Sequence, residues 1–449
     1  MRIVALDKES KQSILNDLLK RSPNNYSQYE STVNQIIEKV RAEGDKALFD
    51  YTLQFDKFAL SAENIRVTKE EIAEAYAQMD ENLIDVIRQS AENIRAFHQK
   101  QLRNSWFDAK PDGTILGMKI TAIERAGVYV PGGKAAYPSS VLMNVIPAKV
   151  AGVDEIIMTT PPGKDGKVNP GTLVAADIAG VDTIYKVGGA QAIAAMAFGT
   201  QSVPKVDKIT GPGNIFVATA KRMVSGIVGI DAVAGPTEIA IIADKGANPS
   251  WLAADLIGQA EHDELAGSVL ITDNEEIAEQ VQENLKYRVS RTEHSERVNT
   301  SLRGRQSGII LTDGIEQSID AANAYAAEHL EVQTADPDAV IAKIRNAGAI
   351  FRGPYSPVPL GDYMSGSNHV LPTGGTARFA AGLGVHTFMK PVEVIEYDEE
   401  GLKALAARIN AFAVSEDLPA HGECVLSRFV KDPYDKATLR EQEKEAGLR

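Results

Sequence analysis

The sequence predicts an α/β fold with two doubly wound, Rossmann-like parallel-sheet modules, an N-terminal helical layer and a small C-terminal tail domain. Three observations lead to this prediction. The chain has 449 residues, too many for one compact core. Its first 105 residues show the apolar spacing of helices. From about Lys119 onward, short apolar strands alternate with helices, which is typical of βαβ units and a parallel sheet.

The N-terminal region reads as helical and polar. Val33, Ile36, Ile37 and Val40 recur at helical spacing, and charged residues fill the other faces. We therefore expect a layer of helices that covers another part of the protein.

Two blocks of alternating strands and helices follow. The strands of the first block are predicted at Gly127–Val130, Glu155–Thr159, Thr183–Val187 and Lys208–Thr210, and its helices at Ser140–Val150, Gly171–Ile178 and Ala190–Phe198. The strands of the second are predicted at Glu238–Ala243, Ser268–Thr272, Gly308–Leu311 and Ala349–Arg352, and its helices at Ser250–Ala260, Glu275–Tyr287 and Ile315–His329. The blocks share a rhythm but not their residues, so a duplicated module is one interpretation.

The end of the chain departs from this rhythm. A stretch of about 18 residues after Pro357, rich in Gly, Ser and Pro, is too long for a simple connection, and long ordered loops tend to be functional. A strand at Val392–Tyr397 and an amphipathic helix at Gly422–Val430 follow. This tail is too small to fold alone, so it must pack on the main body or on a partner.

These patterns divide the chain into five predicted segments. They are an N-terminal helical segment (1–25), a helical layer packing on the second module (26–126), a first module (127–236), a second module (237–385) and a C-terminal tail (386–449).

Composition excludes several classes of protein. The formal charge is −14, from 61 acidic and 47 basic residues, which argues against a general nucleic-acid binder. Cys424 is the single cysteine, so neither an internal disulfide nor a multi-cysteine zinc site can form. The N-terminus shows no secretory h-region, and no stretch approaches the roughly 20 apolar residues of a membrane helix. We expect a cytoplasmic protein.

Four separated polar spots have the residue types of a metal and redox centre. They are Gln259 with His262, the pair Glu328-His329, Asp362, and His421. Nitrogen and oxygen ligands of this kind suit zinc or a similar divalent ion. A neutral imidazole beside a carboxylate also suits proton abstraction near pH 7. The two chemistries together indicate an enzyme.

Each spot taken alone also has an ordinary interpretation. Gln259 and His262 lie at i and i+3 near the end of a predicted helix, on one face. From chemistry alone, Glu261 or Asp263 would be a more usual second ligand than an amide, and spacing does not decide between them. Glu328-His329 is expected at a helix end. Other roles are a loop-holding hydrogen-bond acceptor for Asp362 and a helix cap for Glu416.

Three glycine-rich turns follow predicted strands and open toward helices. They are Val130-Pro131-Gly132-Gly133, Val187-Gly188-Gly189-Ala190-Gln191 and Gly211-Pro212-Gly213-Asn214. Turns of this kind can bring backbone N–H groups close to a pyrophosphate, although none fits G-x-G-x-x-G and no Walker A motif exists. A dinucleotide site and ordinary tight turns both remain open at this point.

Taken in order, these segments resemble the histidinol dehydrogenase family. The matching stretches are Y-V-P-G-G (129–133), G-G-A-Q-A-I-A-A (188–195), G-P-G-N (211–214), A-G-P-T-E (234–238), G-Q-A-E-H-D (258–263), E-H-L-E (328–331), G-D-Y-x-S-G-x-N-H-V-L-P-T (361–373) and A-H (420–421). They span nearly the whole chain, and eight matches in one order are highly specific.

The resemblance implies the identity of the functional residues. One zinc ion per subunit is expected on Gln259, His262, Asp362 and His421, with Glu328 and His329 as the acid/base pair. The substrate-binding residues implied for L-histidinol are Thr237, Gln259, His262, His329, Asp362, Glu416 and His421. Tyr129, Gln191 and Asn214 are expected to face NAD. The implied reaction is a two-step, NAD-dependent oxidation of L-histidinol to L-histidine through histidinaldehyde.

The resemblance also implies a homodimer with intertwined tails and shared active sites, in which the tail packs on the dimer partner. His421 and Glu416 would enter the neighbour's site. The sequence departs from many relatives at Thr237, where serine is common, and at Ala327, where proline is common. Neither departure removes a reactive group. Rival hypotheses are a zinc hydrolase, a related zinc- and NAD-dependent dehydrogenase of another small alcohol, and a non-catalytic zinc or ligand binder.

Overall fold

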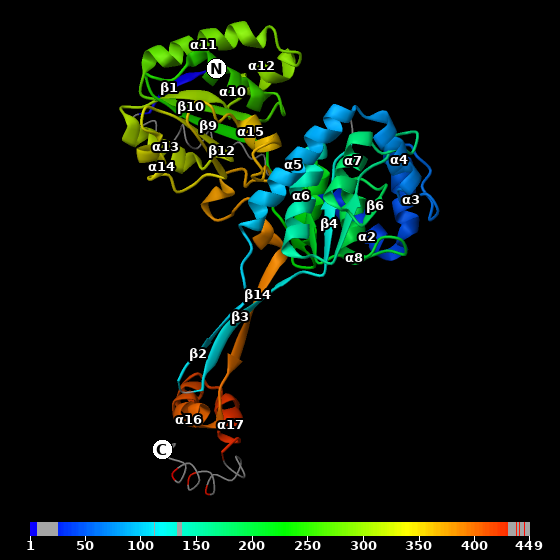
Figure 1. Cartoon of the computed structure of the whole chain (residues 1–449), viewed down its shortest axis with the longest axis vertical. Helices are drawn as coiled ribbons and strands as arrows, with labels where there is room; N and C mark the ends of the chain where they lie inside the picture. The colour runs from blue at the N-terminus through cyan, green and yellow to red at the C-terminus, as the bar shows by residue number, and fades with distance from the viewer. Residues whose placement is uncertain are drawn as a thin grey trace. The chain divides into compact units, whose positions relative to one another are not determined.

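The protein is seen here in a computed structural model that describes residues 1–6, 26–111, 113–132 and 137–429, with Ala437, Arg440 and Lys444. The chain divides into two compact units. The larger unit comprises Met1–Leu102 and Ala122–Phe388, and the smaller comprises Arg103–Thr121 and Met389–Arg449. Both predicted α/β modules fall in the larger unit (Figure 1).

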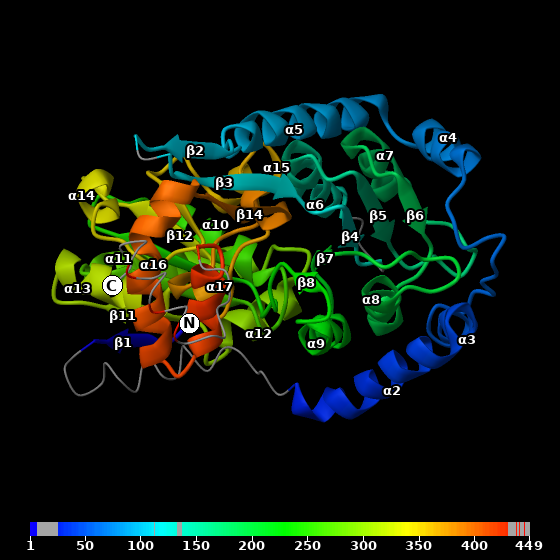
Figure 2. The same cartoon turned by 90° about the horizontal axis from the view of Figure 1, so that it is seen from below.

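The first module has a parallel sheet of five strands in the order β6-β5-β4-β7-β8. The strands are β4 (Arg125–Tyr129), β5 (Glu155–Thr159), β6 (Thr183–Tyr185), β7 (Lys208–Thr210) and β8 (Gly229–Ile230). The helices are α6 (Pro138–Ala151), α7 (Pro170–Ala179), α8 (Gly189–Phe198) and α9 (Ile215–Val224). Helices α6 and α7 cover one face of the sheet, and α8 and α9 cover the other (Figure 2).

Local sequence signals set the ends of two of these helices. Pro138 and Pro170 open α6 and α7, where a missing N–H costs nothing and the ring presets the helical φ. Gly152 and Gly180 end the same helices in the left-handed region, with φ of 86° and 88°. The chain therefore turns back into the sheet at defined points.

The second module has a parallel sheet of six strands in the order β1-β11-β10-β9-β12-β13. The strands are β1 (Ile3–Ala5), β9 (Glu238–Ala243), β10 (Gly267–Thr272), β11 (Gly308–Leu311), β12 (His329–Gln333) and β13 (Ala349–Arg352). The helices are α10 (Pro249–Ala260), α11 (Glu275–Val289), α12 (Ser295–Arg303), α13 (Ile315–Tyr325), α14 (Pro337–Ile341) and α15 (Val358–Tyr363). Helices α10, α11 and α12 lie on one face, and α13 on the other (Figure 1).

The two modules share one topology. Numbered from the first strand of each, β4–β8 and β9–β13 both run in the spatial order 3-2-1-4-5, and β1 is an added edge strand in the second. This is the doubly wound strand order 3-2-1-4-5-6 without its sixth strand. The prediction of two doubly wound modules is confirmed, and the shared order supports a duplicated module.

The N-terminal layer consists of four helices that pack mainly on the first module. They are α2 (Ser27–Glu43), α3 (Asp45–Phe55), α4 (Lys69–Gln78) and α5 (Glu81–Gln99). The apolar face of α2, from Val33 to Val40, joins the core of α8 and α9. Helix α5 packs on α6 and α7, and it also reaches the second module, because Asn93 donates a hydrogen bond to the carbonyl of Met364 at 2.7 Å. This arrangement differs from the predicted packing on the second module, because the four helices lie mainly against α6, α7, α8 and α9 of the first.

Three predictions about elements in the larger unit are wrong. The helix predicted at Ile315–His329 ends at Tyr325, where Ala326 turns into the left-handed region (φ 51°), and His329 opens strand β12 instead. Asp362 lies in the short helix α15 rather than in a loop. Ile3–Ala5 is an edge strand in a segment predicted to be helical, and residues 7–25 of that segment lie outside the described residues.

The smaller unit combines the tail with an earlier part of the chain. Strands β2 (Trp106–Ala109), β3 (Ile115–Ala122) and β14 (Met389–Glu396) form a sheet in the order β14-β3-β2, followed by α16 (Glu399–Ser415) and α17 (Pro419–Leu426). The predicted strand at Val392–Tyr397 overlaps β14, and the predicted helix at Gly422–Val430 overlaps α17, which begins three residues earlier and ends at Leu426. Of the apolar side chains described in this unit, only Ala406 and Leu426 are fully buried. So small a core fits the expectation that the tail cannot fold alone.

Candidate active site

A chain of hydrogen bonds joins three side chains of the second module. Gln259, in the last turn of α10, donates from Nε2 to the hydroxyl of Thr237 at 2.7 Å. Thr237 in turn donates to Oε2 of Glu328, which also accepts the backbone N–H of Glu238 at 3.0 Å. Thr237 precedes β9 and Glu328 precedes β12, and these strands are neighbours. The pairing of β9 with β12 therefore brings together residues that are 91 positions apart.

Burial raises the pKa of Glu328. The residue is 6% exposed, and this desolvation raises the pKa of its carboxyl to about 7, against the opposing effect of the Thr237 and Glu238 hydrogen bonds. A carboxyl group with a pKa near neutrality can accept or donate a proton at working pH.

His329 has a fixed orientation and a free nitrogen. Its Nδ1 lies 3.2 Å from the carbonyl oxygen of Glu238, and because a carbonyl only accepts hydrogen bonds, Nδ1 carries the proton. Its Nε2 is buried and has no hydrogen-bond partner in the part of the chain that the structure describes. Burial lowers the pKa of His329 to about 4, so the ring is neutral near pH 7 and Nε2 presents a lone pair.

Three further side chains lie within electrostatic reach of this pair. The electrostatic effects of Asp362 and His262 contribute to the pKa values of both Glu328 and His329. Burial raises the pKa of Asp362 itself. His369 is hydrogen-bonded to the backbone of Asp362, and burial lowers the pKa of its ring to about 4. The structure thus brings together Thr237, Gln259, His262, Glu328, His329 and Asp362 as the sequence predicted, and it adds His369.

These residues gather at the amino ends of the parallel strands β9 and β12. Ligands of open α/β sheets usually bind at the carboxyl ends. Helices α10 and α15 place Gln259 and Asp362 at this edge.

The donor set around Gln259 fits a divalent cation. Nε2 of Gln259 is engaged by Thr237, and its Oε1 is buried without a hydrogen-bond partner among the described residues. An orphaned amide oxygen near an imidazole and a carboxylate is a reasonable zinc ligand. Asp263, the alternative ligand considered from chemistry, uses its carboxylate to accept the N–H of Leu265 at 2.8 Å. The unpaired Oε1 therefore supports Gln259 as a ligand.

Not all of the residues predicted to bind zinc lie in the larger unit. In the described ranges, no group of three or more His, Cys, Asp or Glu side chains could hold a metal by itself. The remaining predicted residues, His421 in α17 and Glu416 after α16, belong to the smaller unit, and both are exposed. Their role in the site stays a prediction.

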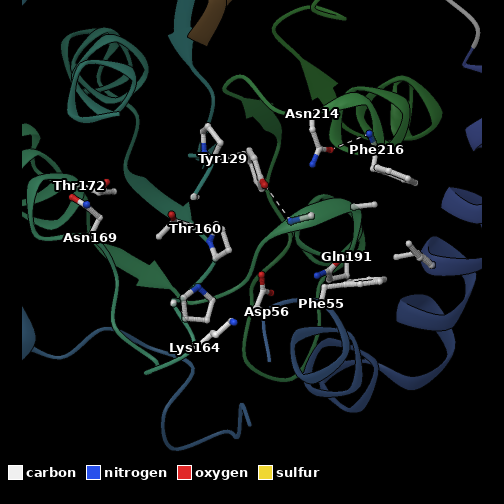
Figure 3. A pocket seen from close by; sticks show the side chains of 18 of the residues that line it. Phe55, Asp56, Tyr129, Thr160, Lys164, Asn169, Thr172, Gln191, Asn214 and Phe216 are labelled. Carbon is white, nitrogen blue, oxygen red and sulfur yellow. Dashed lines mark hydrogen bonds between the residues drawn. The ribbon is translucent and has the colours of Figure 1, made fainter. Parts of the chain in front are cut away.

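A pocket of about 790 Å³ opens at the carboxyl ends of the strands in the first module (Figure 3). All three residues predicted to face NAD line it: Tyr129 at the end of β4, Gln191 in α8 and Asn214 before α9. Its volume lies in the usual range for cofactor sites. Oε1 of Gln191 is buried and lacks a hydrogen-bond partner within the described chain, which leaves an acceptor for a ligand.

Side chains already occupy some of the backbone amides that the glycine-rich turns were expected to offer. The hydroxyl of Tyr129 accepts the N–H of Gly189 at 3.1 Å, and Oδ1 of Asn214 accepts the N–H groups of Phe216 and Val217. Burial raises the pKa of Tyr129 to about 12, so it stays protonated and can also donate. Gly133, from the first of these turns, lies outside the described residues.

Sequence reasoning missed the ion pair that holds the third turn. Lys221 and Asp231 form a buried pair, Lys221 donates to the carbonyl of Gly211 at 2.9 Å, and Asp231 accepts the N–H of Gly211 at 2.8 Å. Neither residue belongs to a motif, and the pair forms only because α9 and the segment after β8 meet. No sequence signal would have indicated it.

Two doubly wound modules, one with a dinucleotide-sized pocket and the other with a buried histidine–carboxylate pair, define an α/β enzyme of the dehydrogenase class. Comparisons with known proteins specify the family. The family model for histidinol dehydrogenase matches residues 19–429. A histidinol dehydrogenase of Bifidobacterium longum (strain NCC 2705) is 66% identical over 429 residues, covering 93% of this chain and 91% of that protein.

More distant relatives agree. The histidinol dehydrogenase of Clostridium acetobutylicum is 51% identical over 398 residues, covering 89% of this chain and 92% of that protein. The crystal structure of histidinol dehydrogenase from Elizabethkingia anophelis superposes with a TM-score of 0.90 at 36% identity, covering 95% of this chain and 98% of that one. The chain belongs to the histidinol dehydrogenase family, and it is an oxidoreductase. No helix in the described ranges is long and apolar enough to cross a membrane.

Proposed function

We propose that this enzyme oxidises L-histidinol to L-histidine in two NAD-dependent hydride transfers, with one zinc ion per subunit, at the end of histidine biosynthesis. The observation that carries the proposal is the lone pair on Nε2 of His329, which is buried without a partner in the described chain next to a carboxyl group whose pKa is near neutrality. Family membership supports the same reaction.

His329 acts as the base of both oxidations. Its Nδ1–H is held by the Glu238 carbonyl, so Nε2 accepts the hydroxyl proton of the substrate while hydride leaves the carbinol carbon. NAD supplies the hydride acceptor. The product of this step is an aldehyde, which has no transferable hydride until water adds to form a gem-diol.

Glu328 suits the activation of that water. With a pKa raised to about 7, it takes a proton from water more readily than an ordinary carboxylate would. Thr237 and the Glu238 N–H hold its Oε2 in place, which fixes the orientation of the carboxyl group. His329 then accepts the proton of the gem-diol as the second hydride leaves, and the acid is the product.

The remaining polar residues would bind the cation and the substrate. Gln259, His262 and Asp362, with His421 from a second subunit, would hold zinc, which supplies a site for the imidazole and amino nitrogens of histidinol. Oε1 of Gln259, left without a partner among the residues described, fits this role. Glu416 from the second subunit would bind a cationic group of the substrate. The homodimer with shared sites and the cytoplasmic location both stay predictions.

The test is the stoichiometry of the reaction. Purified enzyme given L-histidinol and excess NAD should form two NADH per histidinol, followed by absorbance. Treatment with a chelator should abolish this activity, and added zinc should restore it. A panel of other small amino alcohols tests the rival hypothesis of a related dehydrogenase, which would oxidise one of them in preference to histidinol. No NADH from histidinol, or one NADH with accumulated aldehyde, would contradict the proposal.

A further inference from the structure

Asp56 is a charged residue of the first-module pocket that the predicted reaction does not use. It follows α3 and lines the pocket together with Tyr129 and Gln191. Among the residues described as lining the pocket, it is the only carboxylate. Figure 3 shows its side chain pointing into the pocket. Asp56 also acts electrostatically on the hydroxyl of Tyr129, which places the two polar groups near each other.

The carboxylate of Asp56 lacks hydrogen-bond donors. Its Oδ2 is buried and has no hydrogen-bond partner in the described chain, and burial raises the pKa of the group to about 6. The cations of the same pocket do not neutralise it: Lys167 pairs with Glu74 at 2.5 Å, and no ion pair joins Asp56 to Lys164 within the part described. Leaving a buried carboxylate oxygen unpaired is costly, so a ligand that brings donors would stabilise this arrangement.

The usual source of such a carboxylate in a doubly wound fold is missing here. A dinucleotide site commonly has an acidic residue at the end of the second strand, where it accepts hydrogen bonds from the adenosine ribose. The second strand of this module is β5, which ends at Thr159 and continues into Thr160 and Pro161. Asp56 reaches the same pocket from α3, outside the sheet.

The position of Asp56 indicates which end of the dinucleotide it meets. Helix α3 packs on α8, on one face of the sheet. The loop after Asp362 contacts the opposite face, because Asn368 donates to the carbonyl of Met143 in α6 at 2.7 Å. The reacting nicotinamide must approach the Asp362 side, where His329 lies. The adenosine end then lies on the α3 side with Asp56.

We propose that Asp56 accepts hydrogen bonds from the adenosine ribose hydroxyls of NAD and thereby selects NAD against NADP. A ribose 2′,3′-diol offers two donors to one carboxylate, whereas a 2′-phosphate would bring negative charge against it. The inference rests on the proposed use of a dinucleotide in this pocket.

The test is direct binding, measured by calorimetry on the full-length enzyme without histidinol. The ligands are NAD, NADP and an NAD analogue with 2′-deoxyadenosine. The variant is Asp56→Asn, and the matched control is Asp154→Asn, which changes an exposed aspartate outside the pocket. Wild type should bind NAD at least about tenfold more tightly than NADP or the deoxy analogue, in line with hydrogen bonds to a charged acceptor.

Asp56→Asn should bind NAD about tenfold more weakly, and its preference for NAD over NADP and over the deoxy analogue should fall by a similar factor. The control should match wild type. If Asp56→Asn does not fold, Asp56→Glu is the second variant. It moves the carboxylate by one methylene, so it should weaken NAD binding while NADP still binds poorly. If wild type binds NAD and both variants keep its full affinity and selectivity, this inference alone is overturned. Wild type that binds no dinucleotide would overturn it together with the proposed cofactor.

Discussion

The carboxyl groups of Glu331 and Asp255 are hydrogen-bonded to each other inside the second module. Gln333 donates from its amide to both, at 2.8 Å to Glu331 and 3.1 Å to Asp255, and Glu331 also accepts the N–H of Val358 at 3.3 Å. Asp255 lies on α10, Glu331 on β12, and Val358 opens α15. The cluster thus joins the three elements that carry Gln259, His329 and Asp362.

Removing Glu331 should weaken the fold. In Glu331→Ala, Asp255 keeps only the Gln333 donor, the N–H of Val358 loses its acceptor and a cavity forms, so we expect the free energy of unfolding to fall by about 3 kcal/mol. Glu331→Gln keeps a donor for Asp255, and Gln333 can turn its amide to match, so it should lose only about 1 kcal/mol. Urea unfolding of both variants measures the difference. Equal losses would show that the hydrogen bond to Asp255 contributes nothing.

The same pair makes stability depend on pH. Burial raises the pKa of Glu331 well above 4.5, and the pKa of Asp255 is also raised, chiefly by burial. The folded protein therefore binds more protons than the unfolded chain. This contribution is complete below about pH 4.5 and is lost as pH rises toward the folded-state pKa. The free energy of unfolding of wild type should fall over this window more steeply than that of Glu331→Gln, by at most about 1.4 kcal/mol per pH unit. Parallel pH profiles would contradict the shared proton.

The elements that the sequence missed have a common physical reason. A central parallel strand is usually a run of apolar residues. Strand β12 instead places His329, Glu331 and Gln333 on one buried face. Because the start of this strand is polar, the helix was predicted to continue as far as His329. Helix α15 contains Pro359 and Gly361, which predict a loop. The regular βα units, whose turns carry Pro and Gly at the expected places, were predicted well.

Gly211 tests the turn beside the pocket. Its φ is +114°, and a Cβ there would lie 2.0 Å from the carbonyl oxygen of Tyr129. Gly211→Ala should therefore destabilise the enzyme by about 2–4 kcal/mol and weaken NAD binding, because Tyr129 must shift. Gly258→Ala is the control, since a Cβ at this helical position meets nothing within 4 Å and should be neutral or stabilising by up to about 1 kcal/mol. Thermal unfolding and NAD titration provide the readouts, and similar behaviour of the two variants would exclude strain at Gly211.

Residue types alone predict only part of the candidate site. Histidines and carboxylates marked Glu328, His329, His262 and Asp362. Family resemblance selected Gln259 over Glu261 and Asp263 and added Thr237. The hydrogen bonds that join Thr237 to Glu328 depend on the pairing of β9 with β12, which no local pattern encodes. Asp56 follows a helix with no motif around it, and only the shape of the pocket reveals it.

His329 should be needed for turnover and not for the metal. His329→Asn removes the Nε2 base while a side chain of similar size fills the site, so kcat should fall by about 10²–10⁴. Zinc content, measured by atomic spectroscopy, should match wild type. His294→Asn, at an exposed position, is the control and should change neither value. Unchanged turnover in His329→Asn would remove His329 from the mechanism.

His421 tests whether two chains share each active site. His421→Asn should lose zinc and activity, because it removes one predicted ligand. If the tail of one chain completes the site of its partner, a heterodimer of His329→Asn and His421→Asn has one site with both defects and one intact site. Random re-association should then restore about a quarter of wild-type activity, since half of the dimers are mixed and half of their sites are intact. Mixing His329→Asn with Asp362→Asn is the matched control and should restore none, because both changes lie in the larger unit of each chain. Activity that stays absent from the first mixture, despite proven heterodimers, would place His421 in the site of its own chain.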